Sequence, residues 1–349
     1  MLSSRSRVLV VDDSPTARRM LARSLAGEAD IEVVGEAGDA ARAHELVGEI
    51  GPDVITLDLE MPGTYGLDFL RQLMRERPTP VIVVSAHTAP GSLVALDALR
   101  AGAVDVILKP RGSVALAGLG AMLKEKIRGL RQSDVTVHAE APVRGTNRSV
   151  PIAPPQGDGI IAIGASAGGP QAIEALLTRL PVESPPILIV QHMPATFVPL
   201  LVQRLDQSCA LRVVVANGGE TLSRGTVYLA PGDQHLLVDQ HAGLLRLRTS
   251  RGPRVRFHRP AVDVLFQSLA RLRQVTVVGV LLTGMGEDGA DGMLALHREG
   301  HETIAEDRRS CVVFGMPRAA IARGAVSKVL PLDLIPPAIV SCFERSSQP

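Results

Sequence analysis

Short apolar runs alternate with amphipathic segments along nearly the whole chain, and this alternation limits the folds open to it. In the first 130 residues the apolar runs have strand length, and the segments between them repeat with the helical period. Strands that alternate with helices form parallel sheets. The expected strands are residues 7–11, 31–36, 54–57, 81–85 and 104–108, and the expected helices are 16–26, 40–50, 66–75, 92–101 and 114–130. We therefore predict a doubly wound α/β domain with a five-stranded parallel sheet in residues 1–130.

Residues 131–158 show no sustained period and mix Ser, Thr, Arg, Gly and Pro, including Pro154-Pro155, so we predict a linker there. The alternation resumes in residues 159–345, where the strands from Tyr228 to Leu247 look like hairpins added to a parallel core. We predict a second α/β domain with a mostly parallel sheet and an added hairpin. Its expected strands are 160–164, 187–191, 211–215, 225–230, 236–239, 244–247, 275–282 and 302–305, and its expected helices are 170–180, 197–205, 262–272 and 290–299.

Composition narrows the class of protein. No segment reaches the ~20 apolar residues of a membrane span, and the first apolar run is too short for a signal peptide, so we expect no membrane insertion. The three cysteines have neither paired nor metal-binding spacing, which favours a reducing, cytoplasmic environment. A net charge of +1 and an aromatic content of 2% argue against a nucleic-acid partner.

Polar side chains follow the strands of the first domain. Asp12 and Asp13 follow the first strand, Asp58 follows the third, and a serine and a lysine end the fourth and fifth, at Ser85 and Lys109. Ligands of parallel sheets bind at the carboxyl ends of the strands, where these side chains would meet. Three carboxylates repel one another unless a cation lies among them, and their hard oxygens suit Mg²⁺. Helix capping explains any one aspartate, but it explains the whole set poorly.

The motifs at residues 10–14, 55–62, 84–86 and 108–110 resemble those of response-regulator receiver domains, over roughly residues 7–130. The resemblance implies a flavodoxin-like sheet, Mg²⁺ as cofactor and a sensor histidine kinase as phosphodonor. The residues it assigns are Asp58 as phosphate acceptor, Asp13, Asp58, the Glu60 carbonyl and (through water) Asp12 for Mg²⁺, and Ser85 and Lys109 for the phosphoryl group. The sequence departs from the family pattern at Val106 and at Thr64-Tyr65, which puts the transmission of phosphorylation in question.

A small-residue turn joins the first strand of the second domain to a helical pattern, with Ser166 between Gly164 and Gly168. The turn satisfies the pattern G-x-S-x-G of a serine nucleophile, and it also reads as a degenerate dinucleotide or phosphate loop. The dinucleotide interpretation requires an acidic residue at the end of the next strand, and the chain has Gln191-His192 there. We therefore favour a nucleophile.

His192 and Asp288 would reach the same edge of the sheet, because each follows an apolar strand. Ser166 would attack an acyl carbon, His192 would take and return its proton, and Asp288 would hold the imidazole. Backbone N–H groups of the turn at residues 284–286, or of the helix after Ser166, are alternatives for the oxyanion. A lone histidine is more often a hydrogen-bonded structural residue, but a carboxylate available to orient it favours catalysis.

The motifs at residues 164–170, 191–194, 229–235, 258–266, 282–290 and 311–317 resemble the catalytic domain of the chemotaxis protein-glutamate methylesterase (CheB) family. The resemblance implies demethylation of glutamyl γ-methyl esters and deamidation of glutamines on methyl-accepting chemotaxis receptors, with no cofactor for the esterase chemistry. It implies a catalytic triad of Ser166, His192 and Asp288, an oxyanion amide at Met285, and a chemotaxis-type (CheA-like) kinase as phosphodonor. It further implies that the unphosphorylated receiver covers the catalytic crevice.

Two residues beside the predicted triad, Ala167 and Glu287, bear on its activity. Ala167 stands where the family often has a hydroxyl residue, and Glu287 adds a negative charge that would slightly raise the pKa of the catalytic histidine. A basic stretch suits a solvated hairpin, an electropositive rim for an acidic substrate helix, or contact with the receiver; its members are Arg246, Arg248, Arg251, Arg254, Arg256, His258 and Arg259.

Two other functions fit the sequence less well than an esterase. A DNA-binding response regulator would need a recognition helix and a basic face, and the second domain has an α/β pattern instead. A receptor-binding scaffold without catalysis is disfavoured by the intact Ser, His and Asp set.

Overall fold

The computed structural model describes residues 5–61, 66–85, 89–109, 116–135, 152–153, 157–241 and 243–344. The chain divides into two compact units, residues 1–144 and 145–349, and each is described by itself. Within the described ranges no helix is both long enough and apolar enough to cross a bilayer.

The first unit is built on a parallel five-stranded sheet with the order β2-β1-β3-β4-β5. Strands β1 and β3 are neighbours although β2 lies between them in sequence, so the strand order reverses at this pair. Its strands are β1 (Ser6–Val11), β2 (Ile31–Ala37), β3 (Val54–Leu57), β4 (Val81–Ser85) and β5 (Asp105–Leu108), with β6 (Asp134–Val135) after the last helix. Its helices are α1 (Pro15–Leu25), α2 (Ala40–Ile50), α3 (Gly66–Glu76), α4 (Ala89–Arg100) and α5 (Leu116–Gln132).

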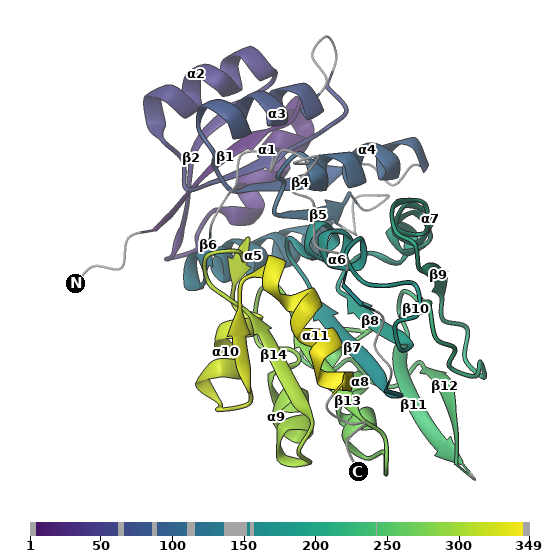
Figure 1. The fold of residues 1–349 in the computed structure, drawn as a ribbon. Coiled ribbons are helices and arrows are strands. Elements are labelled where there is room, and N and C mark those ends of the chain that lie inside the picture. The colour runs from purple at the N-terminus through teal and green to yellow at the C-terminus, as the bar shows by residue number, and fades with distance from the viewer. Residues whose placement is uncertain are drawn as a thin grey trace. The chain divides into compact units, whose positions relative to one another are not determined.

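Helices cover both faces of this sheet, as the doubly wound pattern predicts (Figure 1). Helix α1 packs with α5, while α2, α3 and α4 pack in series. The central strands β3 and β4 are buried along their whole length, which explains their continuous Val, Ile and Leu content. The predicted five-stranded parallel fold is confirmed. The start of the fifth predicted helix, the Thr64-Tyr65 departure and Pro154-Pro155 lie outside the described residues.

The second unit is built on a seven-stranded sheet in which every pairing is parallel, with the order β16-β14-β13-β7-β8-β10-β9. Strands β7, β8 and β13 are central. Its strands are β7 (Ile160–Ala165), β8 (Ile187–Gln191), β9 (Arg212–Val215), β10 (Thr226–Leu229), β11 (His235–His241), β12 (Leu244–Ser250), β13 (Val277–Leu281), β14 (Glu302–Glu306), β15 (Val313–Phe314) and β16 (Lys328–Leu330). Its helices are α6 (Gly169–Leu177), α7 (Val198–Ser208), α8 (Val262–Ala270), α9 (Ala290–Arg298), α10 (Met316–Ala322) and α11 (Ile335–Glu344), with short 3₁₀ turns η2 (Ala195–Phe197) and η3 (Leu332–Leu334).

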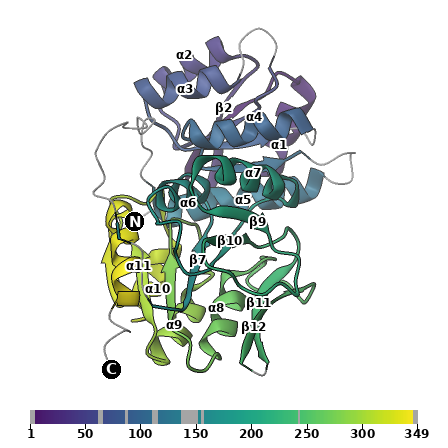
Figure 2. The ribbon, with the colours of Figure 1, turned by 45° about the vertical axis from the view of Figure 1, so that its right-hand side comes forward.

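Alternate residues of the central strands enter two cores on opposite faces of this sheet. Ile161 and Ile163 of β7 belong to a core completed by α6, α7 and α11. Ile160 and Ala162 belong to a core completed by α8, α9, α10 and the β11–β12 hairpin. The hairpin lies at the opposite edge of the domain from α10 and α11 (Figure 2). The central strands are thus fixed from both sides, and their carboxyl ends form a rigid edge.

The second domain agrees with the predicted class and differs in detail. The strand containing Tyr228 was expected in a hairpin, but β10 pairs in parallel with β8 and β9, and only β11 and β12 form the antiparallel hairpin. Helices α10 and α11 and strand β16 were not predicted, because β16 has only three residues and both helices contain proline in their first turn, which obscures the helical pattern. Helix α5 runs to Gln132, two residues into the predicted linker.

Candidate active site

The predicted residues Ser166, His192 and Asp288 follow three adjacent strands of the second sheet, β7, β8 and β13. Ala165 is the register partner of Gln191, so Ser166 and His192 directly follow paired residues. The backbone N–H of His192 donates to the Ala165 carbonyl at 3.0 Å, which continues the ladder to the strand ends. Strand order reverses between β7 and β13, where open α/β sheets bind their ligands.

Ser166 lies in a tight turn with 7% of its surface exposed. Its N–H donates to the Thr283 carbonyl at 3.0 Å, and the N–H of Gly169 donates to the Ser166 carbonyl at 2.9 Å. The left-handed conformation of this turn falls on Gly168, with φ +73°, and Ser166 is absent from the residues with positive φ. The strained serine of the α/β-hydrolase elbow is therefore not reproduced, although the sequence pattern matches it.

His192 and Asp288 form a direct side-chain pair. Nε2 of His192 lies 2.8 Å from Oδ2 of Asp288, and the two side chains are 7% and 1% exposed. The other ring nitrogen, Nδ1, is buried and has no hydrogen-bond partner in the part of the chain that the structure describes. The carboxylate thus fixes one end of the imidazole and leaves a single nitrogen available for proton transfer.

Asp288 is held in place by the start of α8. Its Oδ2 accepts from the N–H of Val262 at 2.7 Å, and its Oδ1 accepts from the N–H of Asp263 at 3.0 Å. Burial works against the charged form of Asp288, but the hydrogen bond and charge of His192 and the two backbone donors outweigh it, so its pKa is lowered. Asp288 is therefore an oriented carboxylate that remains ionised at neutral pH.

Two further residues shape the site and were missed in the sequence. The Gln191 side chain donates to the carbonyls of Ser166, at 2.8 Å, and of His192, at 3.0 Å, and so ties the two segments together. A Cβ on Gly284 would lie 2.9 Å from the Ser166 Cβ and 2.3 Å from the Met316 sulfur. The turn that carries Met285 therefore packs directly against Ser166. The only sequence signal for either residue is its position at a strand end.

Ala167 is buried, and its carbonyl accepts from the Thr283 hydroxyl at 2.9 Å. The same hydroxyl accepts from the N–H of Val313 at 2.9 Å. Below it, the buried carboxyl of Glu306 accepts from the N–H of Thr283 at 2.7 Å, and burial raises the pKa of Glu306 to about 7. The backbone after the serine is thus supported by Thr283 from the neighbouring strand end.

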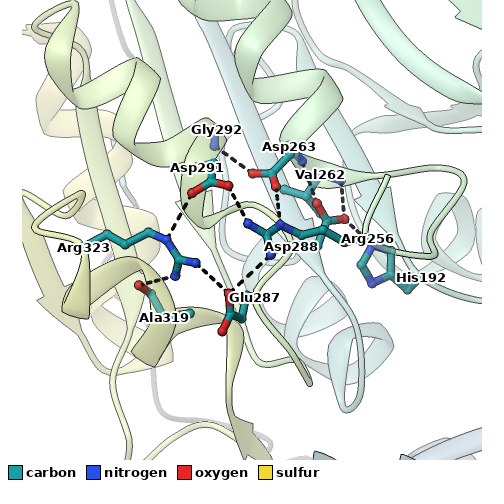
Figure 3. A network of polar contacts seen from close by, with 10 residues as sticks. All are labelled: His192, Arg256, Val262, Asp263, Glu287, Asp288, Asp291, Gly292, Ala319 and Arg323. Atoms are coloured by element: carbon teal, nitrogen blue, oxygen red, sulfur yellow. Dashed lines mark hydrogen bonds and ion pairs between the residues drawn. The ribbon is translucent and has the colours of Figure 1, made fainter. Parts of the chain in front are cut away.

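Glu287, beside Asp288, is paired with two arginines. Arg323 reaches its carboxylate at 2.6 Å and Arg256 at 3.3 Å (Figure 3). These arginines, Arg323 first, lower the pKa of Glu287 and compensate its charge. Figure 3 shows Arg256 among three carboxylates, and it also pairs with Asp263 at 3.2 Å and Asp291 at 2.5 Å.

Most arginines of the basic stretch make contacts within the second domain. Of its six arginines, four pair with carboxylates of the same domain. Arg248 pairs with Asp239, Arg254 and Arg259 pair with Asp233, and Arg256 pairs with Asp263, Glu287 and Asp291. The guanidinium of Arg246 donates to the Gly219 carbonyl at 3.3 Å. These contacts favour a structural role for the paired arginines over an uncompensated electropositive rim.

The first domain carries a separate acidic cluster. One carboxylate oxygen from each of Asp12, Asp13 and Asp58 lies within 4.8 Å of the others. Lys109 bridges two of them, with Nζ 2.7 Å from Asp12 and 2.5 Å from Asp58. Ser85 is fully buried at the end of β4, and its carbonyl accepts from the N–H of Lys109 at 2.7 Å. The predicted residues of this site are therefore brought together at one edge of the sheet.

The electrostatics of this cluster suit a cation. Burial raises the pKa of Asp58, and Asp12 raises it further, while Lys109 acts in the opposite direction. Burial lowers the pKa of Lys109, but the two carboxylates outweigh burial and raise it. A Cβ on Gly66 would lie 2.5 Å from the Asp58 carbonyl, so this glycine is needed beside Asp58. The oxygen donors fit Mg²⁺, and Lys109 supplies the positive charge that the carboxylates require.

The two folds and their sites define a response regulator with a receiver domain and a second, α/β domain. A family model of the response regulator receiver domain matches residues 8–118, and one of the CheB methylesterase matches residues 161–339. The chain belongs to the CheB methylesterase family, as the resemblance predicted.

Curated relatives match over nearly the whole chain. The protein-glutamate methylesterase/protein-glutamine glutaminase 4 of Anaeromyxobacter dehalogenans (strain 2CP-C) is 44% identical over 96% of this chain and 94% of its own length. The protein-glutamate methylesterase/protein-glutamine glutaminase of Salmonella typhimurium is 42% identical over 95% of both chains. The crystal structure of the Thermotoga maritima CheB methylesterase catalytic domain is 38% identical, with a TM-score of 0.52, over 53% of this chain and 98% of that one.

Proposed function

We propose that this chain is a serine hydrolase that removes methyl esters from glutamyl side chains and deamidates glutamines on chemotaxis receptors. The hydrogen bond of 2.8 Å between His192 and Asp288 carries the proposal, together with the buried Nδ1 of His192, which has no hydrogen-bond partner among the described residues. An imidazole fixed by a carboxylate at one nitrogen is ready to accept a proton at the other. The names of the relatives supply the substrate class.

In the proposed reaction Ser166 Oγ attacks the ester carbonyl carbon while His192 Nδ1 takes its proton. The tetrahedral intermediate collapses as the protonated imidazole returns that proton to the departing methoxide, which leaves as methanol. Water then attacks the acyl-enzyme by the same route and restores the serine; for a glutamine substrate the leaving group is ammonia. Asp288 stays ionised throughout and stabilises the imidazolium.

The backbone N–H of Met285 is proposed as an oxyanion donor. The turn at residues 284–286 packs against Ser166 through Gly284, and its amide groups lie at the same strand-end edge. Donors placed where charge develops are worth about 10²–10³ in rate each.

The receiver is proposed to control this activity, with residues 1–130 as receiver, 131–158 as linker and 159–345 as catalytic domain. A sensor histidine kinase, of the CheA-like type, would phosphorylate Asp58. Asp12, Asp13, Asp58 and the Glu60 carbonyl would hold Mg²⁺, which supplies charge neutralisation for phosphoryl transfer. Ser85 and Lys109 would contact the phosphoryl group, and phosphorylation would uncover the catalytic crevice. The site of action would be the cytoplasm.

The test incubates methylated and amidated receptor fragments with the wild-type chain and with Ser166→Ala, and follows both products by mass spectrometry. We expect the variant to lose several powers of ten in rate for both reactions. Equal product from the two proteins would refute the mechanism. Ser208→Ala is the matched control, because that serine ends α7 and its hydroxyl donates to the Leu205 carbonyl within the same helix.

A further inference from the structure

A second histidine lies against the proposed catalytic one. The rings of His192 and His258 are stacked, with centroids 3.8 Å apart and planes within 4° of parallel. Among the described residues, the His192 ring has a hydrogen-bond partner at Nε2 and none at Nδ1. The Nε2 bond alone therefore leaves the plane of the ring free to rotate. A flat ring stacked at this distance restricts that rotation.

His258 is presented by an unusual turn. The backbones of Val255 and His258 bond to each other in both directions, at 3.0 and 2.8 Å. The two residues between them, Arg256 and Phe257, have φ of +47° and +67°. Side chains other than glycine and asparagine rarely adopt this conformation at both central positions of a turn. A turn of this kind needs contacts elsewhere to hold it.

Arg256 supplies those contacts. Its guanidinium pairs with Asp263, Glu287 and Asp291 (Figure 3). Asp263 is the residue whose N–H donates to Asp288, so the turn is fastened to the same backbone that orients the triad carboxylate. On its other side Arg259 pairs with Asp233 at 2.8 Å and donates to the Gly252 carbonyl at 2.9 Å.

We propose that His258 is a positioning residue for His192. The turn that Arg256 anchors holds the His258 ring flat against the His192 ring, so that Nδ1 of His192 faces Ser166. This inference rests on the proposed function of Ser166. Stacking on His258 fixes the plane of the His192 ring, and the bond to Asp288 fixes the position of its Nε2. Together they leave a single orientation for the His192 ring. Loss of the stack is expected to lower the turnover number, because misplacement of a reacting group by about 1 Å costs up to about 10² in rate. Substrate binding would change little.

The test measures kcat and KM separately on a methylated receptor fragment for His258→Ala, His258→Leu and His258→Phe in the full chain. We expect kcat to fall about tenfold or more in the Ala and Leu variants, with KM within about threefold, and to recover in the Phe variant because a flat ring is restored. The Leu variant fills the space without a flat ring, so the Leu and Phe pair decides the question even if Ala disturbs folding. His241→Ala, an exposed histidine on the hairpin, is the control.

Unchanged kcat in His258→Leu, or a Phe variant as slow as Leu, would overturn the proposal. A double-mutant cycle adds a second test: Arg256→Gln should lower kcat, and Arg256→Gln combined with His258→Leu should be no slower than His258→Leu alone. Fully additive losses would overturn the role of Arg256 in the turn. Ser166→Ala separates the proposed function from the positioning role of His258. Activity that survives in Ser166→Ala would refute the proposed function. An inactive Ser166→Ala together with an unchanged kcat in His258→Leu would refute only the positioning role.

Discussion

Substitution of Asp288 by Asn is the most informative perturbation of the triad. The carboxylate accepts at Oδ2 from His192 and Val262, and at Oδ1 from Asp263. Asn has one acceptor oxygen, so its amino group must face a donor in either orientation. With the amino group at Oδ2, it donates to Nε2 of His192 and drives the ring proton to Nδ1, which can then no longer accept the serine proton.

The magnitude follows from these contacts. A histidine held in the wrong tautomer in a serine triad loses about 10⁴ in kcat, or about 5.4 kcal/mol at 1.36 kcal/mol for each tenfold change. Two donors facing each other in a buried site cost about 1–3 kcal/mol of folding stability. The loss of rate thus greatly exceeds the loss of stability, and the protein should remain folded at assay temperature.

The assay compares kcat of wild type and Asp288→Asn at neutral pH, together with thermal unfolding of both. Asp239→Asn is the control, because this carboxylate is exposed on the hairpin and pairs with Arg248 at the surface. The substitution should change kcat by less than about twofold. A loss below about tenfold in folded Asp288→Asn would refute the assigned role of Asp288.

Three further outcomes are expected. A small phosphodonor with Mg²⁺ should raise the esterase rate of the wild type but not of Asp58→Asn, and an unchanged wild-type rate would contradict receiver control. Gly284→Ala should lower kcat about tenfold or more, because its methyl group would press on Ser166 and Met316; wild-type kinetics would contradict the packing. The raised pKa of Glu306, about 7, means that its protonated form stabilises the fold below about pH 4.5 and that this contribution is lost as pH rises through 7. The thermal unfolding temperature should therefore vary less between pH 5.5 and 8.5 in Glu306→Gln than in the wild type. An equal pH dependence in the two proteins would contradict the raised pKa of Glu306.

The sequence predicted the central strands well, because each is a short apolar run that the parallel sheet buries on both faces. It also predicted which residues end those strands, and therefore that Ser166, His192 and Asp288 share an edge. Parallel register alone brings Ser166 beside His192, since their predecessors Ala165 and Gln191 are paired.

What the sequence could not show are contacts that depend on side-chain direction. In the sequence Gln191 argues only against a dinucleotide site, yet its side-chain amide donates to the carbonyls of both Ser166 and His192. The sequence also does not show that two arginines from distant segments, Arg323 and Arg256, pair with Glu287. The stacking of His258 on His192 follows from a turn whose positive φ values no propensity of Arg or Phe would predict.

The central place of β13 has a consequence for how the enzyme is made. This strand inserts between β7 and β14, although β8, β9, β10, the hairpin and α8 all precede it along the chain after β7. During synthesis from the N-terminus, Ser166 and His192 can meet early, but the segment with Asp288 emerges only after most of the domain. The pairing of β7 with β13 is also a long-range contact, which slows folding. A nascent chain would therefore hold its serine and histidine without the orienting carboxylate, and would become an esterase only when translation is nearly complete.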